Sequence, residues 1–148
     1  MRLTSSAFGE NVRIPDRYTC EGIDVSPPLA WSDVPAKTRS FVLICSDPDA
    51  LGKVFHHWGV YNIPATATHL PENWASSGRQ QAVNDFGRAG YGGPCPPEGL
   101  GTHHYHFVLY ALDMAELPVR QGASCAAVHR ALKNHVIATA ELIGIFAR

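Results

Sequence analysis

The sequence predicts a mostly β protein, an antiparallel β sandwich of two sheets with one helix packed on it. Apolar segments rich in β-forming residues occur at 41–46, 58–63 and 102–112, and turn residues lie between them. No helical pattern separates these segments, whereas a βαβ fold would alternate strands with helices. The one convincing helical pattern comes only after residue 124. Strands that follow one another without helices favour packed antiparallel sheets.

Length and composition indicate a single domain, residues 1–148, with a net charge of −1 and a pI near 6.7. A chain of this size buries roughly 68–70% of its unfolded surface, which supplies an adequate core without metals or disulfides. No basic run is present, so we expect no nucleic-acid partner. The N-terminus has no apolar run of about seven residues or more, so we expect neither a signal peptide nor membrane insertion, and a cytoplasmic protein.

The N-terminal part, residues 1–30, is irregular, with short strands predicted at 3–8 and 12–14. The paired prolines of GIDVSPPLAW exclude a helix, so we expect an edge segment that wraps the sandwich. The next strand, 41–46, is a continuous apolar run, which is typical of a strand covered on both faces. It stops at Asp47-Pro48-Asp49, which puts two carboxylates at a strand end.

A histidine stands at the start of each of the next two strands. Alternation from His57 predicts a face composed of His57, Gly59, Tyr61 and Ile63. In the strand at 102–112, alternation predicts one face with His103, Tyr105, Phe107 and Leu109, and another with His104, His106, Val108 and Tyr110. His103 and Tyr105 are therefore expected to point the same way.

Loop signals dominate from residue 64 to 93 and continue in a glycine- and proline-rich stretch before the last of these strands. Gly90, Gly92 and Gly93 allow backbone conformations closed to other residues. Prolines at 94, 96 and 97 fix φ and lack amide donors, so residues 91–101 can form neither a helix nor a central strand. We expect a shaped loop that ends beside His103.

The helical pattern near the C-terminus is a stripe made of Val128, Leu132, His135, Thr139 and Leu142. Ser124 is the expected N-cap of this helix and Gly144 its C-terminal stop. Within it, His135 is expected to be a hydrogen-bonded core residue and not a ligand.

The four cysteines, Cys20, Cys45, Cys95 and Cys125, lie far apart and form no C-x-x-C pair. This spacing argues against a zinc knuckle or a thioredoxin-like motif. We expect buried free thiols, with Cys95 as the exception because its loop could expose a thiol.

Several blocks in order resemble the phosphatidylethanolamine-binding protein family, specifically its bacterial and archaeal Raf-kinase-inhibitor-like branch. They are CEGIDVSPPLAW, DPDA, HHWGVYNIP, RQQAVNDFG, GYGGPCPP with the HHY that follows it, and NHVIATAELIG. The resemblance spans nearly the whole chain. It implies two antiparallel sheets in Greek-key connection and a pocket for a small ligand.

From the residues alone, Asp47 and Asp49 are explained as turn formers. The resemblance instead implies that both acids line the pocket, together with the histidines that match the family's pocket histidines. The predicted ligand-binding residues are Asp47, Asp49, His57, Gly93, Cys95, Pro96, Pro97, His103 and Tyr105. Two nearby positions depart from the family pattern: Leu51 stands where proline is usual, and His104 where arginine is usual. The second departure removes a fixed cation.

The expected ligand is small and either anionic or zwitterionic. Histidines, a tyrosine hydroxyl and loop amides can bind phosphate oxygens, but two carboxylates would repel a dianion. A phosphoethanolamine head group resolves this conflict, because its phosphate suits the histidines and its ammonium suits the acids. The resemblance also implies a kinase or serine protease as a possible partner, and a homodimer.

The residues also allow two alternatives to a binding protein. A hydrolase could use Asp47 and Asp49 as acid and base, or Cys95 as a nucleophile assisted by His103. The sequence shows no evident oxyanion hole, so we expect no enzyme. A metal site is disfavoured because His103 points away from His104 and His106 and no glutamate follows closely, so we expect neither a metal nor a cofactor.

Overall fold

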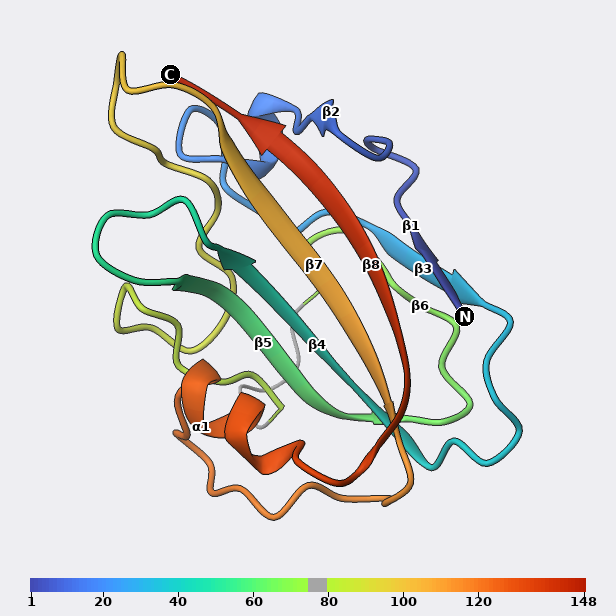
Figure 1. The fold of residues 1–148 in the computed structure, drawn as a ribbon. Helices are drawn as coiled ribbons and strands as arrows, with labels where there is room; N and C mark the ends of the chain where they lie inside the picture. The colour runs from blue at the N-terminus through green and yellow to red at the C-terminus, as the bar shows by residue number, and fades with distance from the viewer. Residues whose placement is uncertain (75–79) are drawn as a thin grey trace.

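The computed structural model describes residues 1–74 and 80–148. Their strands form two sheets (Figure 1). The smaller sheet has the order β1-β3-β6 and the larger has the order β2-β8-β7-β4-β5. The smaller sheet comprises β1 (Arg2–Thr4), β3 (Leu29–Ser32) and β6 (His69–Leu70). The larger comprises β2 (Val12–Arg13), β4 (Ser40–Asp47), β5 (Phe55–Pro64), β7 (His103–Leu112) and β8 (Val136–Phe146). This confirms the predicted β sandwich.

The strand pairs are antiparallel apart from β2 with β8. A short 3-10 helix covers Asp16–Tyr18, and the α-helix α1 covers Cys125–Ala131. The paired prolines precede β3, which is the central strand of the smaller sheet. The expectation of an edge segment there was wrong, because β1 and β6 pair with its two sides.

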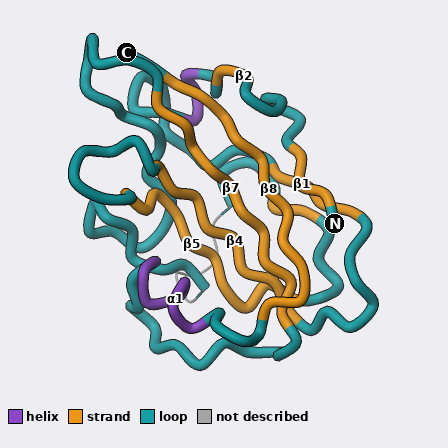
Figure 2. Tube along the Cα trace, in the orientation of Figure 1, coloured by secondary structure: helices purple, strands orange, loops and turns teal. Residues whose placement is uncertain are grey.

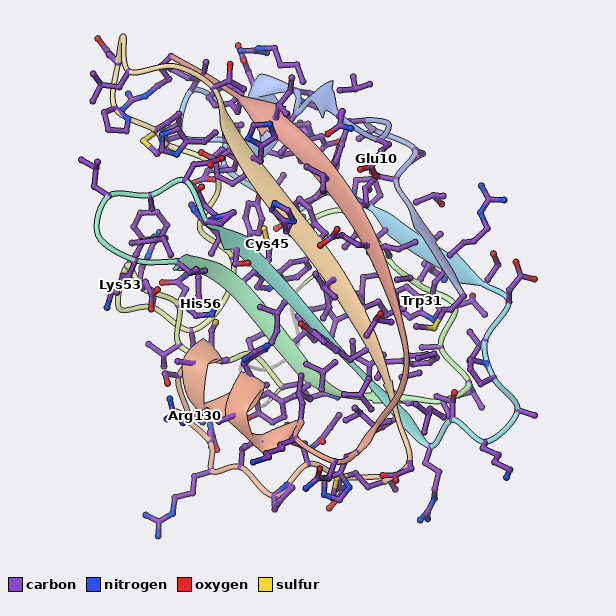
Figure 3. All side chains as sticks on the ribbon, viewed as in Figure 1. Glu10, Trp31, Cys45, Lys53, His56 and Arg130 are labelled. Carbon is purple, nitrogen blue, oxygen red and sulfur yellow. A yellow bond between two sulfur atoms is a disulfide. The ribbon has the colours of Figure 1, made fainter. Side chains whose placement is uncertain are left out.

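Strand β7 lies between β4 and β8 in the larger sheet, as Figure 2 shows. Its alternate residues, among them Tyr105 and Phe107, are buried in the core between the two sheets, while His104 is exposed. The predicted alternation along this strand is therefore confirmed. The same core includes Trp31 of the smaller sheet and Cys45 of the larger (Figure 3).

Strand β4 is covered on both faces, as the continuous apolar run predicts. Leu43 belongs to the core between the sheets, whereas Ile44 packs with Val128 and Leu132 in a second cluster around α1. The strand is thus held rigidly, and it ends at Asp47. This fixes the position of the first carboxylate.

Strand β5 contains a β-bulge at His57 that sequence alternation did not predict. Cys45 pairs with Trp58 and Ser46 with His56, so His57 has no partner on β4. An extra residue shifts the side chains after it to the opposite face, here as far as a second register shift that returns Ile63 to the core between the sheets. His57 consequently points into a cavity and Trp58 into the core, while Gly59 faces Cys125 of α1. The predicted shared face of His57, Gly59, Tyr61 and Ile63 was therefore wrong.

The predicted C-terminal helix is correct only for its first part. Ser124 is the N-cap, and its side chain accepts a hydrogen bond from the amide of Ala127 at 3.0 Å. The helix nevertheless ends at Ala131, and Asn134 adopts a left-handed φ of 70° before β8 begins. Residues 136–146 pair with the whole length of β7, so tertiary pairing overrode the helical spacing. His135 is only half-buried, and its Nδ1 is hydrogen-bonded to Asp113 Oδ1 at 3.0 Å, so it is hydrogen-bonded as predicted but is not a core residue.

Two of the four cysteines form a disulfide. Cys20 is bonded to Cys95, with their Cα atoms 5.4 Å apart, whereas Cys45 and Cys125 are buried free thiols. The expectation of free thiols was right for Cys45 and Cys125 and wrong for Cys20 and Cys95. Loop folding brings Cys20 and Cys95 together across 75 residues, which spacing alone cannot reveal.

Replacing Gly144 by alanine should lower the free energy of unfolding by about 1–3 kcal/mol. Gly144 lies in β8 opposite Tyr105, and a Cβ there would come within 2.5 Å of Ile14 Cγ1 and 2.8 Å of Phe8 Cε2. Gly9→Ala is the matched control, since its Cβ meets only Val12 Cγ2 at 3.5 Å. Urea unfolding measures both variants, and equal stability would show that β8 is not packed this tightly.

Candidate functional site

A cavity of about 350 Å³ opens at the end of the larger sheet where β4 ends and β7 begins. Its floor is polar and its walls are apolar. The lining residues are Asp47, Asp49, Ala50, Leu51, Phe55, His57, Phe86, Cys95, Pro96, Pro97, Leu100, His103 and Tyr105. They come from β4 and the loop after it, from β5, from the 80–101 connection and from β7.

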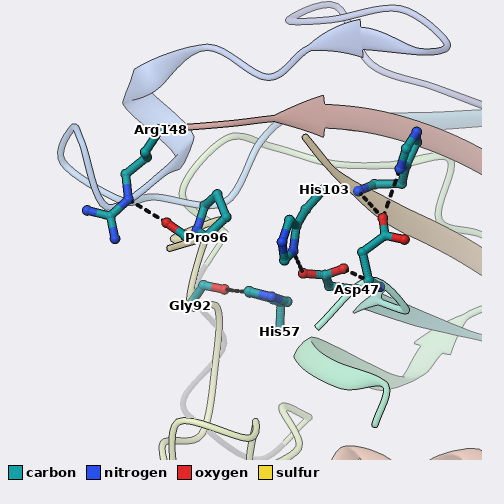
Figure 4. Close-up of polar contacts among 8 residues, drawn as sticks. Asp47, His57, Gly92, Pro96, His103 and Arg148 are labelled. Carbon is teal, nitrogen blue, oxygen red and sulfur yellow. Dashed lines mark hydrogen bonds and ion pairs between the residues drawn. The ribbon is translucent and has the colours of Figure 1, made fainter. Parts of the chain in front are cut away.

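The floor is organised by a hydrogen bond between Asp47 and His103 (Figure 4). His103 Nδ1 lies 2.7 Å from Asp47 Oδ2, and both side chains are buried. Because a carboxylate only accepts, Nδ1 carries the proton and Nε2 is the free ring nitrogen. The other oxygen of Asp47 accepts the amide of Asp49 at 2.8 Å, which shapes the turn. Asp47 is thus fixed through both of its oxygens.

Asp49 is held by the next residue along β7. Asp49 Oδ2 accepts hydrogen bonds from the backbone amide and from Nδ1 of His104, each at 2.8 Å. The His104 hydrogen bond lowers the pKa of Asp49 below its ordinary value. His104, at the position where the sequence resemblance implies arginine, supplies the partner of Asp49 here. The carboxylate remains exposed at the cavity rim, unlike Asp47.

His57 is buried in a ring of aromatic side chains. Its ring centroid lies 4.9 Å from Phe55, 5.5 Å from Phe86 and 5.2 Å from Tyr105. Its Nδ1 donates to the carbonyl of Gly92 at 2.7 Å, which leaves Nε2 without a proton in the neutral ring. Burial lowers the pKa of His57 below 6.5, although the Gly92 carbonyl and the charge of Asp47 act in the opposite direction. The neutral ring therefore offers an acceptor to the cavity.

The hydroxyl of Tyr105 is buried and has no hydrogen-bond partner within the described residues. Tyr105 is fully buried, and burial together with the charge of Asp47 raises the pKa of its hydroxyl far above the ordinary value. An unpaired buried hydroxyl costs about 1–3 kcal/mol of stability. Since Tyr105 lines the cavity, a bound oxygen acceptor could satisfy this donor.

The wall loop 90–97 depends on glycine for two different reasons. Gly90 has a φ of 122°, which favours glycine, as the sequence predicts. Gly92 and Gly93 have no left-handed φ, and they are needed for space. A Cβ on Gly92 would come within 2.5 Å of Phe86 Cδ2. A Cβ on Gly93 would meet Asp24 Oδ1 and the carbonyl oxygen of Tyr18, each at 2.3 Å.

The structure brings together every predicted site residue apart from Gly93. Gly93 does not line the cavity. Its amide donates a hydrogen bond to Asp24 Oδ1 at 2.9 Å, which anchors the loop. Cys95 lines the wall as a disulfide and not as a thiol. Whether the remaining residues bind a ligand stays a prediction.

Sequence analysis missed the apolar residues of the cavity, chiefly Phe55, Phe86 and Leu100. Phe86 stands in the RQQAVNDFG block, and Asn84 in the same block builds the turn that presents it. Asn84 Oδ1 accepts the amide of Phe86 at 3.0 Å, and its Nδ2 donates to the Gly90 carbonyl at 2.9 Å. At the rim, Leu51 is 86% exposed, Leu100 66% and Phe86 45%. Apart from the Asp49 carboxylate, the mouth of the cavity is therefore apolar above a polar floor.

Across residues 1–74 and 80–148, no group of three or more His, Cys, Asp and Glu residues is arranged to hold a metal ion. In the same part of the chain, no helix combines the length and the apolar character needed to cross a membrane.

The fold and the site together define a two-sheet β sandwich with one polar-floored cavity at a sheet end. A family model described as phosphatidylethanolamine-binding protein matches residues 4–147. The chain belongs to this family, which confirms the resemblance seen in the sequence.

Relatives cover the whole length of the chain. A UPF0098 protein of Methanothermobacter thermautotrophicus is 48% identical over 100% of this chain and 99% of its own. A UPF0098 protein of Aquifex aeolicus is 45% identical over 100% of this chain and 89% of its own.

Solved structures of homologues share the fold. YbcL of Escherichia coli, described as a member of the mammalian PEBP family, has a TM-score of 0.91 at 38% identity and covers 99% of this chain and 98% of its own. A PEBP homologue from Chlamydia trachomatis has a TM-score of 0.89 at 39% identity, with 99% and 97% covered.

Replacing Tyr105 by phenylalanine should leave the ligand-free protein equally stable or raise its free energy of unfolding by about 1 kcal/mol, because an unpaired buried hydroxyl is removed. Tyr91→Phe is the matched control. Tyr91 donates its hydroxyl to the carbonyl of Tyr18 at 2.7 Å, so this variant should lose about 1 kcal/mol. Chemical denaturation compares the two variants. Greater destabilisation by Tyr105→Phe than by Tyr91→Phe would mean that the Tyr105 hydroxyl has a partner.

Proposed function

We propose that this protein binds a small phosphate-containing ligand, with a phosphoethanolamine head group as the best fit, and does not turn it over. The observation that carries the proposal is the hydroxyl of Tyr105, which has no partner among residues 1–74 and 80–148 and lies on the same cavity floor as two histidines. The family model's description, which names phosphatidylethanolamine, supports the same ligand class.

The anionic half of the ligand belongs on the floor of the cavity. His57 and His103 each use Nδ1 for a fixed internal hydrogen bond, so only Nε2 can reach a ligand. In a protonated ring Nε2 is a donor, and together with the Tyr105 hydroxyl it matches phosphate oxygens. A neutral His57 presents a lone pair to the phosphate and repels it. Binding is therefore coupled to proton uptake by His57.

The cationic half belongs near Asp49. This carboxylate is exposed at the rim, and the lowered pKa keeps it ionised. An ammonium group reaching from the phosphate would neutralise the Asp49 charge that otherwise opposes an anion. The exposed Leu51 and Leu100 then offer apolar surface to whatever group the phosphodiester carries. The rim thus suits a head group attached to an apolar substituent.

A hydrolase is the second candidate, because the hydrogen-bonded Asp47 and His103 pair resembles a general base with its orienting acid. The Cys95 nucleophile of the sequence-based alternative is not available while Cys95 is in a disulfide. The hydrolase mechanism that stays compatible with the geometry is one in which His103 acts as a general base and activates a water molecule.

Affinity for glycerophosphoethanolamine should rise as the pH falls from about 7.5 to about 5.5, because the lowered pKa of His57 lies in or below this window. A bound anion raises that pKa, so the protonated form must bind more tightly. Each unit by which the anion raises the pKa gives about a tenfold gain. As a phosphodiester, this ligand lacks the second phosphate ionisation near pH 6 and keeps one charge throughout. Calorimetry at both pH values gives the measurement.

The control for this titration is a pair of glutamine variants. His57→Gln keeps a polar group but should lose the pH dependence, while His69→Gln, at an exposed position of β6, should keep it. The ordinary pKa of a histidine is about 6.5, and an acidic neighbour would raise it. Burial prevails for His57, so the gain continues below that value. Equal affinity at the two pH values in the wild type would remove His57 from the site.

Chromogenic phosphate and acyl esters should show no saturable hydrolysis above the uncatalysed rate. The reason is that a single neutral donor, the Tyr105 hydroxyl, would stabilise an oxyanion formed beside His103 only weakly. Steady-state assays of the wild type and of Asp47→Asn make the comparison. Hydrolysis that saturates and disappears in Asp47→Asn would establish the hydrolase and overturn the binding proposal.

The remaining expectations from the family resemblance belong to this proposal as well. Inhibition of a kinase or a serine protease would use the apolar rim as its contact surface, and a homodimer would change the exposure of that rim. A cytoplasmic location also stays a prediction.

A further inference from the structure

The cysteines fall into two chemically distinct pairs. Cys45 and Cys125 are buried, and burial raises the pKa of the Cys125 thiol to about 12, which makes it a poor nucleophile. Cys20 and Cys95 are both solvent-exposed, and they are the pair joined by the disulfide. Exposed disulfides are open to attack by thiolates, whereas buried thiols cannot compete for the same sulfurs. Cleavage is thus expected at one bond only.

The disulfide forms part of the cavity wall, since Cys95 lines the cavity between Pro94 and Pro96. Among residues 94–97, only Cys95 has an amide hydrogen, so this segment has few donors with which to fix itself. Its carbonyls supply the other anchors. Cys20 donates its amide to the Pro94 carbonyl at 3.1 Å, and Arg148 Nε donates to the Pro96 carbonyl at 2.7 Å (Figure 4). The disulfide is the covalent contact among those that anchor residues 94–97.

The same loop reaches His57 a few residues earlier. The Gly92 carbonyl accepts His57 Nδ1 at 2.7 Å, and the Gly92 amide donates to the His57 carbonyl at 3.0 Å. Gly92 therefore fixes both the position and the tautomer of the histidine. A wall segment released near Cys95 would loosen the Gly92 contact, which transmits the change to the cavity floor.

We propose that the Cys20–Cys95 disulfide is a thiol–disulfide exchange site and that opening it weakens ligand binding in the adjoining cavity. The co-reactant is a low-molecular-weight thiol. Its thiolate attacks one sulfur, expels the other as a thiolate and forms a mixed disulfide. A second thiol molecule resolves this bond, so two electrons pass to the protein, one small disulfide leaves and two protein thiols remain. In the cytoplasm that the sequence predicts, reducing thiols would drive this opening.

The exchange itself is tested on the native protein without any ligand. The protein is equilibrated in buffers of stepped reduced-to-oxidised glutathione ratio, alkylated without denaturant and analysed by peptide mass spectrometry. Cys20 and Cys95 should become labelled together, while Cys45 and Cys125 stay unlabelled and circular dichroism stays unchanged. A disulfide that opens only when the protein unfolds, or labelling of all four cysteines together, would overturn the exchange site.

The coupling to the cavity rests on the proposed function for its affinity readout, so it also needs a ligand-independent one. Affinity for glycerophosphoethanolamine should fall by about fivefold or more on reduction, the scale of one lost hydrogen bond. Independently, the NMR titration of His57 should move towards its ordinary value near 6.5. The Gly92 hydrogen bond raises this pKa and burial lowers it, and burial has the larger effect. A loosened wall weakens the hydrogen bond but also admits water, so the relief of burial prevails.

Cys20→Ser removes the disulfide without changing a residue of the cavity wall, because Cys20 does not line the cavity and Cys95 is kept. This variant should match the reduced wild type in both readouts and ignore further reductant. If glycerophosphoethanolamine fails to bind even the oxidised protein, the proposed function fails, and the His57 titration still decides the coupling. An identical His57 titration in oxidised, reduced and Cys20→Ser protein would contradict the coupling.

Discussion

The pairing of β7 with β4 is the constraint on which the site depends. Because Ser46 pairs with His106, the next and last residue of β4, Asp47, lies beside Tyr105 and within hydrogen-bond distance of His103. A shift of one residue in this register would turn the histidine and the tyrosine to the opposite face of the sheet. The apolar residues farther along β7 prevent such a shift, since they fill the core between the sheets. The core thus fixes the chemistry at the strand end.

The cavity contains polar groups that the fold would be more stable without. Tyr105 has a buried donor without a described partner, and burial disfavours the charged form of His57. Both groups are held in place by well-packed surroundings, with Phe86 seated over Gly92 on one side. Under the proposed function, a bound phosphate oxygen would satisfy the hydroxyl and favour the protonated histidine. Ligand binding would then relieve the free-energy cost of these groups in the ligand-free protein, and this relief would add to the affinity.

The residues were sufficient for the two-sheet fold and for the shared direction of His103 and Tyr105, which strand alternation gives. The family resemblance, and not alternation, put Asp47 in the same pocket, because from the residues alone it was a turn former at a strand end. The sequence was insufficient where tertiary contacts decide. The spacing of 128–142 suits a helix, but pairing with β7 makes β8 a strand after Asn134. The bulge at His57 and the Cys20–Cys95 bond depend on contacts between distant segments, which a single sequence does not encode visibly.

The most direct test of the account is a crystal structure of the oxidised protein with glycerophosphoethanolamine at about pH 5.5, where His57 is more extensively protonated. The account predicts the phosphate on the cavity floor, with its oxygens within hydrogen-bond distance of the Tyr105 hydroxyl and His57 Nε2, and the ammonium near Asp49. A ligand bound elsewhere, or a cavity that stays empty when the ligand saturates the protein in solution, would contradict it.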